Sequence, residues 1–532
     1  MTTQATTTSV SLSRDSNQAL GIGQFAINFM NGSIGEPDEA VLVRTLMFFT
    51  DSMICGLSAI AMATNAPTVL REEALSYEIS GGGGGGGGGG VPIFGSNKPL
   101  APEKAILANC AAVREWDSNG TNFGYNPKLG HTAGEFGHND FYPVAVAAAQ
   151  LANQDGAYAL RGMVLLDEIR GRLAEVFSLK SYKIDHVVHG AIASAATYGA
   201  MRSATAEQIE SAIGMTVAHY IPWRAIRAGK QLSDSKGASA AITTEAAILS
   251  LQRSMRGFVG PGDIFRNPEA IWRQFEPTNG DSPFELVLSH SGGDFAVMGM
   301  HFKLGLYEHQ SAGALQGLID LIQRNPQLLE APQNIASIKI IAYEPAFGII
   351  GDPAKRDPQT RQSADHSMVY IIATVLRKAM QLAQDSGGGG GSTTLADTND
   401  GYWKTLILMP DDYNEQAIFD HQTRALMEKV TFEHGGPEYD AKYPDGIPTS
   451  VIITDTDGKT YDSGLVMYPA GHARNTTANL DELLSHKWQA LGSLASDDAS
   501  SIIDRFNAVP QLSTNDLASL YDFQIIERAG YE

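Results

Sequence analysis

The 532-residue sequence predicts a multidomain protein of the α and α+β class, in which a large all-helical domain is interrupted by an inserted α+β domain. Three observations lead to this prediction. The chain is longer than a single hydrophobic core usually supports. Apolar residues recur at helical spacing from about residue 17 to 300, and a mixed pattern of strands and helices follows. Helical spacing then returns, so we expect the last helices to rejoin the first domain.

The change of pattern gives the expected domain boundaries. They define a flexible N-terminus (1–16), the first part of the helical domain (17–302), the α+β domain (303–472) and the C-terminal helices (473–532). Two glycine tracts, at 81–90 and 387–391, interrupt this plan. No Gly-Lys-Ser/Thr follows the longer tract, so we interpret both as flexible connectors rather than phosphate loops.

Helices of the first domain are predicted from apolar runs that Gly, Pro and Asn clusters separate. Buried helices are expected at "AILANCAAV" (105–113) and "YPVAVAAAQ" (142–150). The longest apolar stretch begins at Ala40 and carries Arg44 and Asp51, which favours a buried helix over a membrane span. Ala, Gly and Ser dominate the segments 189–201 and 236–251, so these helices should approach their neighbours closely and lie centrally.

The second domain is predicted from alternating strand and helix patterns. Strands are expected at 336–343, 402–409 and 428–434, and a hairpin with its turn at Asp457-Gly458 is expected within 450–468. Between them, helical spacing indicates helices at 308–324, 366–384 and 412–427. Residues 479–525 again have helical spacing, which predicts the C-terminal helices.

Composition excludes several kinds of partner and cofactor. The chain has 38 Lys and Arg against 59 Asp and Glu, a net charge of −21 that repels nucleic acids and anionic membranes. Cys55 and Cys110 are too few for an iron–sulfur cluster, and no cofactor or metal is expected. The N-terminus lacks a secretory apolar region and is rich in Ser and Thr, so we expect a cytoplasmic protein, with a mitochondrial location as the alternative.

A polar stretch between two predicted buried helices is the first candidate site. It contains Asp117, Thr121, His131, His138 and Asp140. Loops that a rigid scaffold positions often carry function, although an exposed polar loop is the alternative. A metal site made by the two histidines and Asp140 is disfavoured, because the stretch has no HExxH pattern and the glycines between the histidines fix no geometry.

Several segments, in order, resemble the MmgE/PrpD family over roughly residues 17 to 530. They are "AILANCAAVREWDSNGT", "GHNDFYPVAVAAAQ", "DHVVHGAIASAATYGA", "RAIRAGKQLSDSKGASAA", "YEHQSAGAL", "DPAKRDPQTRQSADHSMVYIIA" and "YPAGHARN". The resemblance implies that the α+β domain forms a lid over the helical domain, with the site in the cleft between them, and that the protein is a homodimer. It also implies a cofactor-independent lyase that acts on a small tricarboxylic acid.

The resemblance also implies the site residues. Carried over position by position, the catalytic residues are Asp117, Thr121, His138, Lys236, His309 and Tyr370, and His186 contacts substrate. We add Arg224 and Arg227, a basic cluster that could bind a tricarboxylate. Asp365 and His366, at the start of a predicted helix, are interpreted as capping residues.

These residue types suit a dehydration. His138 and His309 can act as base or acid, Asp117 can orient His138 or act as the base, and Lys236 can stabilise developing negative charge. Thr121 can hold a substrate hydroxyl or carboxylate. Conversion of 2-methylcitrate to 2-methyl-cis-aconitate is the first expectation. A cis-aconitate decarboxylase is the nearest alternative, because the same cleft and proton donor would serve it, and a non-catalytic acid-binding homologue is the other. Gly120 and the insertion "PKLGHTAGEF" depart from the family pattern, so the substrate-facing edge of the site is expected to differ.

Overall fold

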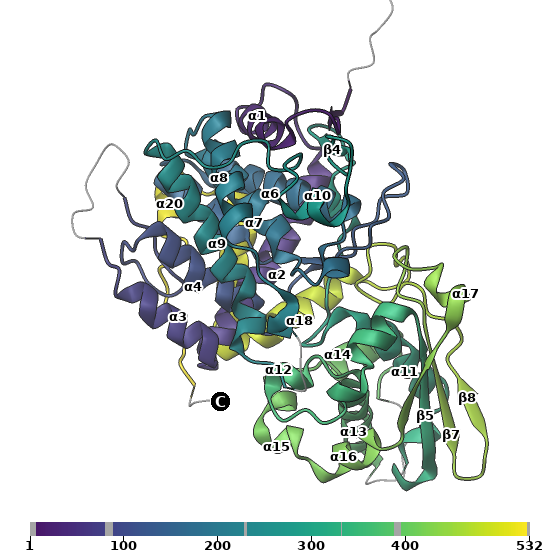
Figure 1. The fold of residues 1–532 in the computed structure, drawn as a ribbon. Helices are drawn as coiled ribbons and strands as arrows, with labels where there is room; N and C mark the ends of the chain where they lie inside the picture. The colour runs from purple at the N-terminus through teal and green to yellow at the C-terminus, as the bar shows by residue number, and fades with distance from the viewer. Residues whose placement is uncertain (1–6, 80–88, 228–230, 331, 388–394, 529–532) are drawn as a thin grey trace, which may run out of the picture.

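The computed structural model describes residues 7–79, 89–227, 231–330, 332–387 and 395–528. It is a mostly helical multidomain α and α+β fold, as the sequence predicts. Figure 1 shows one body of helices built from the first part of the chain, and beside it a part that contains a four-stranded sheet. Residues 81–88 and 388–391 of the two glycine tracts lie outside the described ranges.

The predicted helices of the first part are present. They are α1 (Gln18–Met30), α2 (Glu39–Ala61), α3 (Asn65–Leu75), α4 (Pro102–Arg114), α5 (Tyr142–Leu151), α6 (Gly156–Val176), α7 (Val187–Met201), α8 (Ala206–His219), α9 (Asp234–Met255) and α10 (Ile271–Phe275). Helix α9 packs against α4, α7 and α8, which confirms the central position predicted from its small residues. Close approach is measurable at Gly190 in α7, where a Cβ atom would lie 2.0 Å from Cζ of Phe141.

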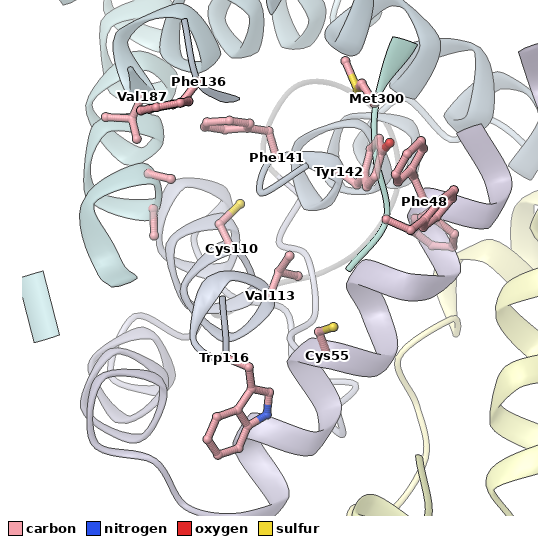
Figure 2. Packing of buried hydrophobic residues seen from close by; sticks show 14 of the residues in the cluster. Phe48, Cys55, Cys110, Val113, Trp116, Phe136, Phe141, Tyr142, Val187 and Met300 are labelled. Atoms are coloured by element: carbon pink, nitrogen blue, oxygen red, sulfur yellow. The ribbon is translucent and has the colours of Figure 1, made fainter. Parts of the chain in front are cut away.

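Helix α2 belongs to the core. Among the described helices it is the one long and apolar enough to span a membrane, but 67% of its most apolar window is buried inside the protein. It packs against α4 and against α18 (Leu480–Ala495). Figure 2 shows Cys55 of α2 and Cys110 of α4 among the packed side chains of this core. Burial raises the pKa of both thiols, which makes them structural side chains rather than nucleophiles.

The helical part also contains a two-stranded sheet. Strand β1 (Ser9–Leu12) pairs antiparallel with β4 (Leu286–Ser289), so this part is not all-helical. Strand β1 falls within the segment expected to be a flexible N-terminus. Its alternating Ser and apolar residues suit a half-buried strand, and Leu12 packs against the core.

The second part is built on strands β5 (Ile335–Ala342), β6 (Val430–His434), β7 (Thr449–Asp455) and β8 (Thr460–Asp462), in the order β6-β5-β7-β8. Strands β5 and β6 are parallel and the other pairs are antiparallel. Helix α11 (Ala312–Arg324) packs against β7, and α13 (Met368–Gly387) packs against α11 and α16 (His421–Met427). The predicted hairpin is present, with Gly458 at φ +81° in its turn.

Two element predictions are wrong. Residues 402–409 were predicted as a strand, but they fall in α14 (Asn399–Thr405) and an irregular stretch. Thr398 begins this helix by accepting a hydrogen bond from the Gly401 amide (3.0 Å), and the aromatic residues that suggested a strand are buried by tertiary packing instead. The helix predicted at 412–427 is divided into α15 (Glu415–Ile418) and α16, because Asp420 caps a second helix by accepting from the Thr423 amide.

The C-terminal segment contacts the helical body. It forms α18, α19 (Ala499–Asn507) and α20 (Thr514–Ala518), and both α18 and α19 pack against α2. The buried ammonium group of Lys487 in α18 lies 2.7 Å from Oδ1 of Asp51 in α2 and donates to the Ser118 carbonyl at the same distance. Helix α18 also contacts α14, so it touches both parts of the fold.

Candidate functional site

A small cavity is lined by residues of both the helical body and the sheet-containing part. The predicted site residues that line it are Asp117, Thr121, His138, His186, Arg224 and Arg227. The opposite wall includes Glu308, Gln310, Ile350, Lys355 and His366. The cavity therefore collects residues that are up to about 250 positions apart in the sequence.

The polar stretch forms part of the cavity wall. Its strands β2 (Thr121–Asn122) and β3 (Gly137–His138) pair antiparallel, which places Thr121 directly opposite His138. The Thr121 hydroxyl donates to the Gly137 carbonyl (2.8 Å), so it is available to a ligand only as an acceptor. Asp117, Thr121 and His138 are all buried, which excludes the exposed polar loop that was the alternative. His131 lies away from this cavity and contacts Glu175.

Asp117 is surrounded by cations. Its carboxylate lies 2.6 Å from Arg114, 3.0 Å from His366 and 3.5 Å from Lys236, and it also accepts from Lys303. Burial opposes ionisation, but these positive charges hold the pKa of Asp117 well below its usual value. Because its oxygens are already paired with these cations, the carboxylate is not free to take a proton from a ligand. No hydrogen bond connects it with His138 among the residues that the structure describes, so neither role considered for Asp117 matches its surroundings.

Lys236 forms ion pairs with two carboxylates of the protein. Its Nζ lies 3.1 Å from Oδ1 of Asp365, in addition to the contact with Asp117, and its side chain is fully buried. Burial lowers the pKa of Lys236, and the two carboxylates oppose that shift. Lys236 does not line the cavity, so it acts on a ligand there only through Asp117 and Asp365.

Two histidines share the helical side of the cavity. The ring centroids of His138 and His186 are 5.1 Å apart. Within the described residues, Nδ1 of His138 and both ring nitrogens of His186 lack a hydrogen-bond partner. Burial, with the nearby charge of Arg114, lowers the pKa of His138 well below its usual value, and burial likewise lowers the pKa of His186. Both rings are therefore neutral near pH 7, and each can accept a proton or a hydrogen bond.

The cations of the cavity differ in how they are paired. Arg227 is bound to Asp185, with its Nη2 3.2 Å from Oδ1. Arg224 has a buried Nη1 with no partner among the described residues, and Lys355 forms no ion pair there either. Burial lowers the pKa of both Arg224 and Lys355, as expected for cations without a bound counter-ion. These two side chains can bind carboxylates of a ligand.

Two predicted catalytic residues lie outside the cavity wall. His309 is buried, with its ring 5.5 Å from Phe123 and 5.4 Å from His301, so Phe123 is its neighbour at the wall. Tyr370 is buried in α13, where its hydroxyl donates to the Asp412 carbonyl (2.6 Å). The structure therefore does not bring Tyr370 together with His138.

Sequence reasoning missed three residues that line the cavity. His366 was interpreted with Asp365 as a helix cap, but α13 begins only at Met368. Its ring lies between two carboxylates, with Nδ1 2.5 Å from Asp365 and Nε2 3.0 Å from Asp117. Glu308 and Lys355 lie inside two of the segments that carry the family resemblance, but the resemblance assigned neither of them a role. Within the described ranges, no group of three or more His, Cys, Asp or Glu side chains is placed to hold a metal ion.

Family models match both parts of the chain. The MmgE/PrpD N-terminal domain matches residues 24–282, and the MmgE/PrpD C-terminal domain matches residues 307–386 and 407–507. The 2-methylcitrate dehydratase of Escherichia coli O157:H7 is 23% identical over 405 residues, which cover 74% of this chain and 76% of the relative. The mitochondrial 2-methylcitrate dehydratase of Yarrowia lipolytica is 26% identical over 330 residues, 61% of this chain and 57% of the relative. The protein belongs to the MmgE/PrpD family.

Proposed function

We propose that the protein is a hydro-lyase that dehydrates a small hydroxy tricarboxylate, with 2-methylcitrate, converted to 2-methyl-cis-aconitate, as the first candidate substrate. One observation carries the proposal: the cavity places the neutral, unpartnered imidazole of His138 together with two cations, Arg224 and Lys355, that form no ion pair with any carboxylate of the described residues. The names of the relatives support the reaction class and the candidate substrate.

The proposed reaction needs a base and a place for negative charge. His138 takes the proton from the carbon next to a substrate carboxylate, and the electron pair of that C–H bond forms the double bond as the hydroxyl group leaves. The adjacent carboxylate gains enediolate character in the transition state. Arg224 and Lys355 bind substrate carboxylates, and their charge stabilises this transition state.

The substitution His138→Gln tests the role of the base. Gln retains a hydrogen-bonding amide but cannot take a proton near neutral pH, so we expect kcat to fall by about 100-fold or more while the melting temperature is unchanged. The formation of unsaturated acid from 2-methylcitrate is followed by absorbance. His131→Gln is the matched control, because His131 contacts Glu175 away from this cavity. A near wild-type kcat in His138→Gln would remove His138 from the mechanism.

Three assays on the wild-type protein separate the candidate functions. Unsaturated acid formed from 2-methylcitrate or citrate without release of CO₂ supports the hydro-lyase. Release of CO₂ from cis-aconitate without dehydration of either hydroxy acid would favour a decarboxylase. Calorimetric binding of these acids with no turnover would instead indicate a non-catalytic homologue.

A further inference from the structure

Two carboxyl groups line the cavity, and their surroundings are opposite. Asp117 has contacts with Arg114, Lys236 and Lys303. Glu308 forms no ion pair with any described residue, although it lies in the same cavity. A buried carboxyl group that no described cation pairs with keeps its proton more readily than one that is surrounded by cations, which makes Glu308 the candidate proton donor of this cavity.

Local structure fixes the position of Glu308. Its backbone amide donates to the Asp365 carbonyl (3.0 Å), which connects it to the segment that carries His366. Its Oε2 accepts from the backbone amide of Gln310 (2.8 Å), at the start of the turn His309–Ser311. Its Oε1 has one weaker partner, the side-chain amide of Gln310 at 3.3 Å. The carboxyl group is therefore held at the cavity wall by neutral donors rather than by cations.

Burial favours the neutral form of Glu308. Burial raises the pKa of Glu308 above its usual value, and the charge of Asp117 acts in the same direction. His366 and Lys303 oppose this shift, but both are bound to Asp117, which offsets their charge. The raised pKa means that the carboxyl group of Glu308 keeps its proton at a higher pH than an ordinary glutamate does. In the same cavity the neutral imidazole of His138 can accept a proton, so Glu308 can act as the proton donor and His138 as the proton acceptor.

We propose that Glu308 is the general acid that protonates the departing hydroxyl group. The inference rests on the proposed dehydration. The Glu308 proton moves to the hydroxyl oxygen, the C–O bond breaks with its electron pair going to oxygen, and water leaves. His138 has by then taken the proton from carbon, and the C–H electron pair forms the C=C bond. Transfer of one proton from His138 to Glu308 through water restores the starting state.

The substitution Glu308→Gln tests the proposal with 2-methylcitrate. We expect kcat to fall by about 100-fold or more with little change in KM, because a neutral amide keeps the hydrogen bonds but cannot give up a proton. Glu308→Asp should recover part of the activity. Glu344→Gln, at an exposed carboxylate of the same part of the fold, is the control and should behave like the wild type.

A substrate whose leaving group needs no proton distinguishes the acid from a structural residue. In the analogue of 2-methylcitrate with chlorine in place of the hydroxyl group, Glu308→Gln should release chloride at close to the wild-type rate, whereas His138→Gln should not. In D₂O, Glu308→Gln should still exchange the substrate proton that His138 removes, as measured by mass spectrometry.

Two results would overturn the assignment. One is Glu308→Gln with at least half of the wild-type kcat on 2-methylcitrate. The other is a loss of chloride elimination as large as the loss of dehydration, which would mean that Glu308 shapes the cavity instead. If Glu308→Gln fails to fold, the same two measurements on Glu308→Leu, which also lacks a transferable proton, decide the question. The wild-type protein is assayed first. If it dehydrates no hydroxy acid, the proposed function itself is refuted, independently of any result with the variants.

Discussion

Asp117 shows at the scale of one residue how this site is held together. Its backbone has φ +51°, a left-handed conformation that costs an aspartate energy, and its carboxylate is buried among cations. Removing one member of a buried charge network leaves the others uncompensated. The strained backbone and the burial are therefore maintained by the ion pairs that Asp117 forms.

The stability of the protein should depend on the charge of Asp117. The pKa of Asp117 is lower in the folded state than in the unfolded chain, so its contribution is fully present above an unfolded pKa of about 3.9 and is lost as the pH falls through the folded value. Asp117→Asn should lower the stability at pH 7 by about 3 to 5 kcal/mol. It should also flatten the decrease in melting temperature below about pH 4.

Melting temperatures measured from pH 7 to pH 2 check this prediction. Asp457→Asn, in the exposed hairpin turn, is the control and should retain the wild-type acid dependence. An Asp117→Asn protein with the same melting curve at every pH would contradict the account.

Individual site residues could be predicted only where the sequence placed them in a dense polar stretch or in a family motif. Asp117, Thr121 and His138 are in such a stretch and line the cavity. Glu308 and Lys355 reach the cavity from distant segments, and neither their spacing nor their neighbours distinguish them from surface charges. Tyr370 was expected from the family resemblance alone, but packing in α13 directs its hydroxyl to the Asp412 carbonyl.

At the scale of elements, helical spacing and small residues were reliable guides, and aromatic content was not. The Ala, Gly and Ser content of 189–201 correctly predicted close packing of α7. The aromatic residues in 402–409 suggested a strand, but Thr398 caps a helix there. Propensity is a weak guide where burial decides the outcome.

Among the positions where helices pack against their neighbours, we expect Gly190 in α7 to tolerate a larger residue least. Gly190→Ala places a Cβ atom against the Phe141 ring and should destabilise the protein by about 1 to 3 kcal/mol. His186 lies one turn before Gly190, so KM should rise as well. Thermal melting and steady-state kinetics give both values.

The matched variant is Gly190→Ala with Phe141→Leu, which removes the ring that the new methyl group meets. Relative to Phe141→Leu alone, adding Gly190→Ala should cost less than it does in the wild type. Equal costs in both backgrounds would show that Phe141 is not the source of the effect.

At the scale of the whole molecule, Lys487 joins three distant segments. From α18 it reaches Asp51 in α2 and the Ser118 carbonyl beside Asp117. Lys487→Met should destabilise the protein by about 3 to 5 kcal/mol, because it leaves the buried Asp51 without its cation. Melting temperature and protease resistance measure the loss. The double variant Asp51→Asn with Lys487→Met should be more stable than Lys487→Met alone, and equal or lower stability would refute this explanation.

The contact between α2 and α18 can form only late in the synthesis of the chain. Asp51 and Lys487 are separated by 436 residues, and ribosomes add about 5 to 20 residues per second, so the nascent α2 waits roughly 20 to 90 s for this partner. During that interval α4 can pack against one side of α2, but the surface of α2 that contacts α18 in the folded protein has no partner. We therefore expect a newly made chain to expose part of this apolar helix through most of translation and to depend on chaperones that bind exposed apolar segments.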